Sequence, residues 1–252
     1  DLDRGFSVID YSINEELASR QAIEDIKNLG VSLKLDFILN HLSVLSPQFQ
    51  DIITNGENSK YKDFFVNWNK FWEGHGQMTE EGYIQPDADI IKDMFFRKPG
   101  LPILMIRFPD GKYVPYWNTF YQEARSDKVD AQDLMKMARL AGEKMQYITA
   151  EILSKKINAA IDEGKTPSEM DFAGYESYQQ LVIDGLEANR KYLGQMDLNI
   201  QSDLVWEYYD TVLKTLAEYG ARIVRLDAFA YAPKAPGEKN FKNEPATWDT
   251  LE

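Results

Sequence analysis

The sequence predicts an α/β domain with parallel strands, and the order helix, glycine, buried strand is the main reason. Residues 14–29 carry apolar side chains at helical spacing, with Asn14 as a candidate N-cap and Gly30 as a stop signal. Residues 31–39 follow as a short apolar run bounded by turns. Such a run is typical of a strand that is covered on both faces.

The same order recurs near the end of the chain. Ser202 is a candidate N-cap for a helix over 203–219, and Gly220 ends that helix. An apolar strand is then expected at 223–228. Two units of this kind imply parallel strands, because each helix carries the chain back before the next strand begins.

The composition excludes several functional classes. With 252 residues, 44% of them hydrophobic and 13% aromatic, the chain is expected to be globular. A formal net charge of −13 argues against partners such as nucleic acid or an anionic membrane surface. There is no cysteine, and His41 and His75 are the only histidines, so no metal site and no cofactor are expected. The sequence has no recognisable signal peptide or membrane span, which favours a cytoplasmic location.

The two strand-bearing segments are separated by a long intervening stretch. Roughly 150 residues lie between them, which is far more than an ordinary connection. We therefore expect an inserted subdomain over 46–194, flanked by sheet-forming parts at 1–45 and 195–252. The chain begins without a strand and stops where a helix would start, so it is expected to be an internal piece of something larger.

The inserted subdomain is expected to combine a small β part with helices. Arg107 to Tyr113 is a turn signal between β-prone residues, which predicts a hairpin. Residues 130–163 and 174–193 read as helical, within an extra insertion at about 122–194. The apolar stripes of these helices predict a core or an oligomer interface, such as that of a homodimer, rather than a cofactor site.

One strand end carries a pair of opposite charges. Arg225 and Asp227 are two residues apart at the end of the strand 223–228, so they share one face of it. The guanidinium can therefore sit beside the carboxylate and orient it, which is one way to prepare a carboxylate nucleophile. A plain salt bridge at the end of a strand is the alternative interpretation.

Polar residues also lie at the end of the other strand. Asp36, Asn40 and His41 stand at and just beyond the end of the strand 31–39. In a parallel α/β protein the carboxyl ends of the strands are where ligands bind. His41 is interpreted as a hydrogen-bond donor to a polar ligand, with a structural histidine as the alternative.

Two further groups have the composition of a sugar site. Asp3 and Phe6 pair a carboxylate with an aromatic ring, and sugars are bound by carboxylates that accept hydroxyl hydrogen bonds and by rings that pack on C–H faces. Gln195 and Asp197 precede the helix at 203–219, near another expected strand end. Each group alone is equally consistent with an ordinary loop, and only the complete set indicates function.

The motifs resemble those of a known enzyme family. The stretch from Asp36 to His41, reading D-F-I-L-N-H, resembles the first conserved region of the α-amylase superfamily, glycoside hydrolase family 13. The stretch from Arg225 to Tyr231, reading R-L-D-A-F-A-Y, resembles the second. Within the superfamily the chain is most similar to the sucrose phosphorylase and sucrose 6-phosphate phosphorylase group, and the resemblance covers everything except about 122–194.

The resemblance implies part of a (β/α)8 TIM barrel with a large inserted subdomain after the third strand. It also implies roles for individual residues. Asp227 would be the nucleophile that forms a covalent glucosyl-enzyme intermediate, and Arg225 would orient it. His41 and Asp3 would bind the glucosyl hydroxyl groups, and Phe6 would pack on the ring.

The other residues of the set would build the site and its subsites. By the same resemblance Gln195 would contact substrate, while Asp36, Asn40 and Asp197 would hold the site together. The implied reaction is retaining α-glucosyl transfer from sucrose, or a related α-glucoside, to inorganic phosphate. A retaining mechanism uses two carboxyl groups about 5 Å apart.

The second carboxyl group of the family pattern is expected beyond the end of this sequence. The isolated chain is therefore expected to be inactive, with an incomplete catalytic apparatus. Two alternatives stay open: an α-glucosidase or sucrose hydrolase that uses water as acceptor, and a non-catalytic carbohydrate-binding fragment of the same fold.

Overall fold

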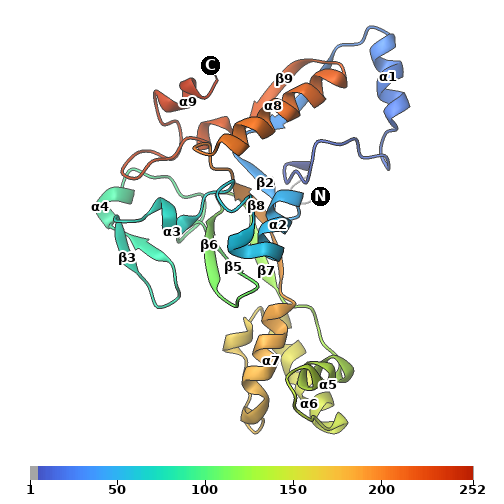
Figure 1. Cartoon of the computed structure of the whole chain (residues 1–252), viewed down its shortest axis with the longest axis vertical. Helices are drawn as coiled ribbons and strands as arrows, with labels where there is room; N and C mark the ends of the chain where they lie inside the picture. The colour runs from blue at the N-terminus through green and yellow to red at the C-terminus, as the bar shows by residue number, and fades with distance from the viewer. Residues whose placement is uncertain (1–4, 252) are drawn as a thin grey trace. The chain divides into compact units, whose positions relative to one another are not determined.

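Two strands from opposite ends of the sequence pair in parallel. In the computed structural model, which describes residues 5–251, β1 (Leu33–Ile38) lies beside β9 (Ala221–Asp227). Each strand follows a helix, α1 (Arg20–Asn28) and α8 (Asp203–Glu218) respectively, and α8 packs along β9 (Figure 1). The predicted pair of helix–glycine–strand units and its parallel pairing are confirmed.

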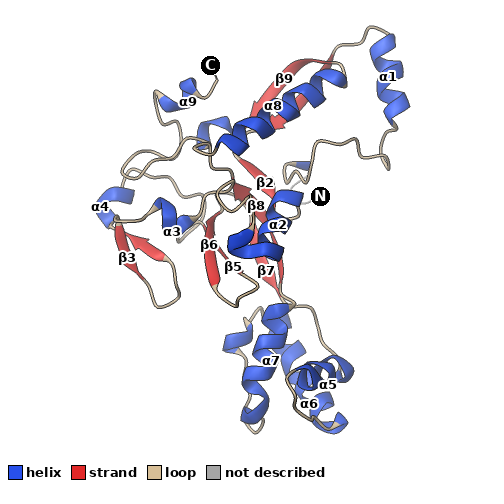
Figure 2. Cartoon of the chain, in the orientation of Figure 1, coloured by secondary structure: helices blue, strands red, loops and turns tan. Residues whose placement is uncertain are grey.

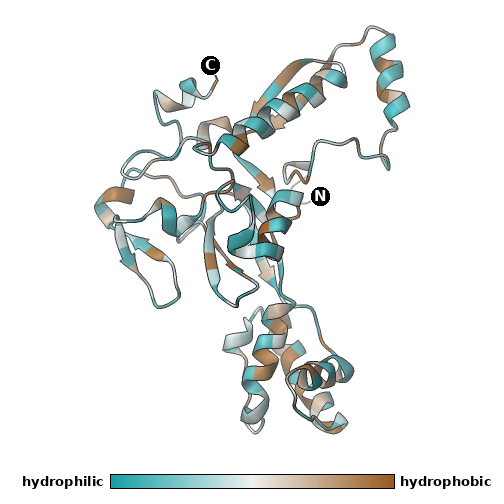
Figure 3. Cartoon of the chain, in the orientation of Figure 1, coloured by the Kyte–Doolittle hydropathy of each residue, from teal (hydrophilic) through white to brown (hydrophobic). Residues whose placement is uncertain are grey.

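The first helix is shorter than the sequence predicted. Its N-cap is Ser19, whose Oγ accepts a hydrogen bond from the N–H of Ala22 at 3.1 Å. Asn14 is not the cap: its Oδ1 accepts from the N–H of Glu16 at 3.1 Å and so closes a local turn instead. Helix α1 buries none of its residues and is largely hydrophilic (Figure 3).

A second sheet, in which β2 and β8 run antiparallel, begins where β1 ends. Strand β2 (His41–Ser43) pairs with β8 (Lys191–Asp197), and β7 (Gln122–Arg125) lies on the other side of β8 (Figure 2). The sequence placed His41 just beyond the end of the strand 31–39, and the structure shows that it starts this further short strand, opposite Asp197. The backbone of His41 is therefore held by sheet pairing.

The small β part has an aromatic core. The predicted hairpin is confirmed as β5 (Ile103–Arg107) and β6 (Tyr113–Trp117). Trp117 packs with Trp68 and Trp72, and all three side chains are fully buried. Rings of this size supply most of the apolar area that such a small subdomain can bury.

The remaining elements are short and connect these parts. They are α2 (Pro47–Asn55), η2 (Gly56–Asn58), α3 (Trp68–Phe71), β3 (Gly76–Met78), β4 (Ile84–Pro86), α4 (Ala88–Ile91), η4 (Phe229–Tyr231) and α9 (Ala246–Asp249). Gly76 is required in the β3–β4 hairpin, because a Cβ there would lie 2.2 Å from the carbonyl oxygen of Gln85. Within residues 5–251 no helix is long and apolar enough to cross a membrane.

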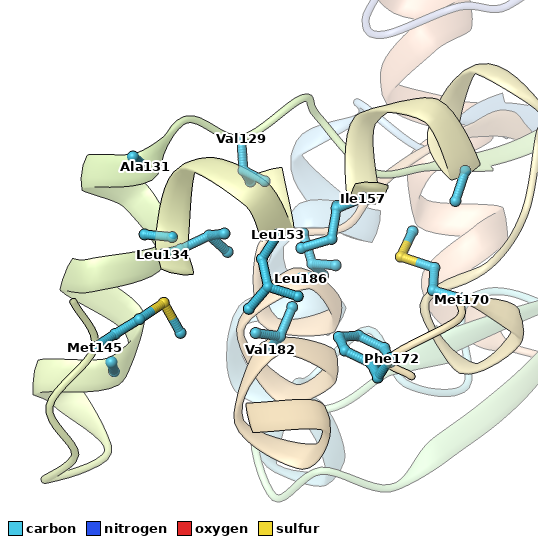
Figure 4. Packing of buried hydrophobic residues seen from close by; sticks show 13 residues of the cluster. Val129, Ala131, Leu134, Met145, Leu153, Ile157, Met170, Phe172, Val182 and Leu186 are labelled. Carbon is cyan, nitrogen blue, oxygen red and sulfur yellow. The ribbon is translucent and has the colours of Figure 1, made fainter. Parts of the chain in front are cut away.

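Residues 123–192 form a compact helical unit of their own. The chain divides there into two units, and the boundaries fall within β7 and β8. The helical unit contains α5 (Ala131–Leu140), α6 (Tyr147–Asp162), the turn η3 (Pro167–Glu169) and α7 (Glu176–Ala188). Side chains from all three helices meet in one buried apolar cluster (Figure 4). That this helical unit is an insertion in a barrel stays a prediction.

Leu153, at the centre of that cluster, is expected to stabilise the helical unit. Its side chain is 0% exposed, whereas Leu140 at the end of α5 is 80% exposed. Replacing Leu153 by alanine should lower the free energy of unfolding by about 2–5 kcal/mol, because it removes buried methyl groups and leaves a cavity. The control Leu140→Ala should stay within about 0.5 kcal/mol. Urea unfolding followed by far-UV circular dichroism measures both, and equal losses would contradict the assigned core.

Candidate active site

The charged side chains at the ends of β1 and β9 form a connected group. Arg225 binds Asp36 in a bidentate manner, with Nε 2.8 Å from Oδ1 and Nη2 2.8 Å from Oδ2. The two residues are register partners in the parallel pair. Asp227 is the second neighbour of the same guanidinium, with its Oδ1 3.9 Å from Nη2. The primary partner of Arg225 is therefore on the adjacent strand, and the sequence interpretation had named only the weaker contact.

This group is open to solvent and therefore accessible to a ligand. The side chains of Asp36, Arg225 and Asp227 are 46%, 44% and 36% exposed. Exposed ion pairs contribute at most about 1 kcal/mol to stability. These ion pairs therefore hold charged groups in place at the surface and contribute little to the free energy of folding.

Phe6 links the charged group to His41. The ring of Phe6 lies 5.7 Å from the Arg225 guanidinium carbon, and its carbonyl oxygen accepts a hydrogen bond from Nε2 of His41 at 3.0 Å. The imidazole is buried and packs against Phe120 with 4.9 Å between the ring centres. Burial lowers the pKa of His41, although the Asp197 carboxylate and the bond to Phe6 oppose this shift. Because a carbonyl oxygen can only accept, Nε2 is the nitrogen that carries the proton in this contact.

Behind His41 lies a buried ion pair. The ammonium of Lys234 donates to Asp197 Oδ2 at 3.0 Å, to Asn40 Oδ1 at 2.9 Å and to the carbonyl of Tyr231. Thr119 completes the shell, because its N–H and its hydroxyl donate to the two carboxylate oxygens of Asp197 at 2.9 and 2.5 Å. Burial lowers the pKa of Lys234, and the adjacent Asp197 carboxylate opposes that shift.

The sequence interpretation missed Lys234, Thr119 and Phe120. Lys234 did leave a signal, because it is a single cation in the small apolar run Tyr-Ala-Pro-Lys-Ala-Pro. A lysine in such surroundings is buried only when it is paired. Thr119 and Phe120 follow strand β6 and left no comparable signal, since their partners are distant in the sequence.

The structure brings together most of the residues that the sequence singled out. Gln195 is buried in β8 opposite Ser43, two residues before Asp197 and on the same face of the strand. Its carbonyl accepts from the side chain of Asn118 at 2.8 Å. Asp3 lies outside the described residues. The functional roles of all these side chains stay predictions.

A hollow borders the charged group. Its volume is about 400 Å³, and Phe6 and Asp36 form one side of it. Leu33, Leu35 and Ile38 of β1 line another part, together with Tyr11. The lining of the hollow therefore combines apolar side chains of β1 with polar ones that include Asp10, Ser12 and Asp36.

The fold resembles that of solved carbohydrate-active enzymes. The crystal structure of sucrose 6F-phosphate phosphorylase from Thermoanaerobacter thermosaccharolyticum matches with a TM-score of 0.63 at 24% identity, covering 100% of this chain and 36% of that one. A second solved structure, a family GH13_31 enzyme, matches with a TM-score of 0.50 at 17% identity, covering 98% of this chain and 33% of that one. A search with protein-family models gives no match.

Sequence comparison finds relatives among the phosphorylases. The chain is 41% identical over 252 residues to a sucrose 6(F)-phosphate phosphorylase of Ilumatobacter coccineus, covering 100% of the chain and 37% of the relative. It is 27% identical to a sucrose phosphorylase of Streptococcus mutans, covering 99% and 35% respectively. The chain is similar over its whole length to sucrose phosphorylases and sucrose 6(F)-phosphate phosphorylases, which confirms the resemblance seen in its motifs. It spans little more than a third of the length of these curated relatives.

The two ion pairs should differ sharply in their effect on stability. Asp36→Asn weakens a pair that is nearly half exposed, so the free energy of unfolding should change by less than about 1 kcal/mol. Asp197→Asn leaves the ammonium of Lys234 buried without its counter-ion, which should cost about 3–5 kcal/mol. Urea unfolding followed by tryptophan fluorescence measures both variants. Similar changes in the two would contradict the assigned burial.

Protonation of His41 should destabilise the fold at acid pH. Because burial holds its pKa below the ordinary 6.5, the unfolded chain binds the proton more tightly than the folded chain. This contribution is complete above about pH 6.5 and is lost as the pH falls toward the folded-state pKa, at up to about 1.4 kcal/mol per pH unit. His41→Gln should reduce the slope of stability between pH 7.5 and about 5. The prediction fails if His75→Gln reduces that slope and His41→Gln does not.

Proposed function

We propose that this chain carries the nucleophile and part of the glucosyl-binding site of a retaining α-glucoside phosphorylase. The donor is sucrose or a related α-glucoside, and the acceptor is inorganic phosphate. The observation that carries the proposal is the carboxylate of Asp227, which lies at the carboxyl end of a parallel strand beside the oriented guanidinium of Arg225. The homology to sucrose phosphorylases over the whole chain supports the same assignment.

In this proposal Asp227 attacks the anomeric carbon of the glucosyl unit. The bond from that carbon to the leaving oxygen breaks, an ester to Asp227 forms, and a second carboxyl group protonates the leaving oxygen. A phosphate oxygen then attacks the same carbon, and the ester breaks to release α-glucose 1-phosphate with retention. Arg225, held by Asp36, fixes the orientation of the Asp227 carboxylate. The proposal assigns no residue of this chain to the acid/base role.

The residues around Asp227 are assigned to binding. His41 would donate its Nε2–H to a glucosyl hydroxyl in place of the Phe6 carbonyl that accepts it in the structure, and Phe6 offers a ring face beside Arg225. Asp3 and Gln195 are retained as substrate contacts from the motif resemblance. Asn40 and Asp197 support His41 from behind, since both bind Lys234.

A cation that is linked to His41 through one aromatic ring supports phosphate over water as the acceptor. Arg97 lies over the ring of Phe120 at 4.9 Å, and Phe120 in turn contacts His41. A guanidinium can bind phosphate through two parallel hydrogen bonds. We assign Arg97 to the acceptor side of the site.

The same proposal accounts for the arrangement of the strands. Strands β1 and β9 are adjacent strands of a (β/α)8 barrel, with residues 46–194 inserted after the first of them. The carboxyl ends of barrel strands form the active-site face in this architecture. Asp36 and Asp227 both lie at such ends.

The test is an assay of the product of the complete gene with sucrose or sucrose 6F-phosphate and inorganic phosphate. We expect α-glucose 1-phosphate, and a loss of at least about a thousandfold in Asp227→Asn because an amide cannot act as the nucleophile. Asp210→Asn is the matched control, since Asp210 lies on the exposed face of α8 and pairs with Lys214. A folded protein that forms no glucose 1-phosphate from either donor would refute phosphorolysis, and release of glucose alone would indicate a hydrolase.

A further inference from the structure

The ammonium of Lys234 is a buried charge with no assigned role in the proposed reaction. Its side chain is 3% exposed, and the side chain of its partner Asp197 is 0% exposed. Removing an ammonium from water costs several kcal/mol even after the protein relaxes. A hydrophobic residue of similar size would avoid that cost. The presence of a lysine at this buried position therefore needs a separate explanation.

The partners of the ammonium determine how the Asn40 amide is turned. An ammonium can only donate hydrogen bonds, so the atom of Asn40 that lies 2.9 Å from Nζ must be the oxygen. The NH2 group of Asn40 then faces Nδ1 of His41 at 3.4 Å. Because that NH2 group can only donate, Nδ1 must be the unprotonated, accepting nitrogen.

The other side of the imidazole gives the same answer independently. Nε2 lies 3.0 Å from the carbonyl oxygen of Phe6, which can only accept. Nε2 therefore carries the proton. The hydrogen bonds from Lys234 through Asn40 and the hydrogen bond to Phe6 therefore favour the same tautomer, with the proton on Nε2.

The anchor of this series of hydrogen bonds is rigid. Both carboxylate oxygens of Asp197 are bound by Thr119, and Asp197 is paired with His41 in the β2–β8 ladder. The N–H of Leu198 also donates to the carbonyl of Asn40 at 2.7 Å. The side-chain series from Asp197 through Lys234 and Asn40 to His41 thus closes a ring with the backbone pairing.

We propose that Lys234 is a positioning residue: through the amide of Asn40 it fixes His41 in the tautomer that donates from Nε2. Its use in catalysis rests on the proposed function, in which His41 donates to a glucosyl hydroxyl. Without the ammonium the amide of Asn40 can rotate, its oxygen can face Nδ1, and the proton can move to that nitrogen. Nε2 of His41, which faces the Phe6 carbonyl, would then have no hydrogen to donate.

The experiment is NMR of the protein labelled with ¹⁵N in the histidine rings, with the His41 signals assigned by their loss in His41→Gln. In the wild type we expect a protonated Nε2 and an unprotonated Nδ1. Lys234→Met should give a mixture of the two tautomers, because the amide is no longer held. Asn40→Asp should leave Nδ1 protonated, because a carboxylate faces it and can only accept.

Controls separate this effect from unfolding and from the proposed function. The double variant Lys234→Met/Asp197→Asn contains no unpaired buried charge, and it should show the same mixture with an unchanged circular dichroism spectrum. Wild-type His41 signals in the folded double variant, or an unprotonated Nδ1 in Asn40→Asp, would overturn the proposal and leave the Phe6 carbonyl as the determinant. The NMR signal needs no substrate, so absence of glucose 1-phosphate would refute the proposed function without affecting this result.

Discussion

The buried ammonium of Lys234 is the interaction on which the arrangement of the strand ends depends. It is satisfied only when the segment after β1, the end of β8 and the segment after β9 all bring an oxygen to it. An ammonium that lacks such partners in the interior is strongly unfavourable. Displacing any one of these segments therefore raises the free energy of the folded chain. The three segments are thus fixed relative to one another around His41.

The two ion pairs of the site have different physical roles. The buried pair restricts conformation, because losing either partner leaves a charge without solvent. The pair of Arg225 and Asp36 is screened by water, so it orients side chains without contributing much to folding. In the proposed site, the exposed charges can change partners while the supporting side chains stay fixed.

Local signals predicted the helices and strands well, and long-range partners were not predictable. Gly30 and Gly220 both adopt positive φ at the helix ends, +72° and +89°, which is why the helix–glycine–strand pattern could be read from the sequence. The start of α1 was wrong because Asn14 can satisfy a turn as well as a helix cap. Arg225 was matched with its neighbour Asp227, because its main partner is 189 residues away in the sequence. Lys234 was missed for the same reason.

The parallel pairing of β1 with β9 has a consequence for the order in which the chain folds. A parallel crossover needs only about a dozen residues, and closing a loop near 190 residues instead adds roughly four doublings of length, or about 2.4 kcal/mol of closure entropy. The helical unit at 123–192 is built from nearby segments and has no such barrier. Formation of this unit would bring β7 and β8 together and shorten the remaining loop. We therefore expect the contact between Asp36 and Arg225 to form after the helical unit.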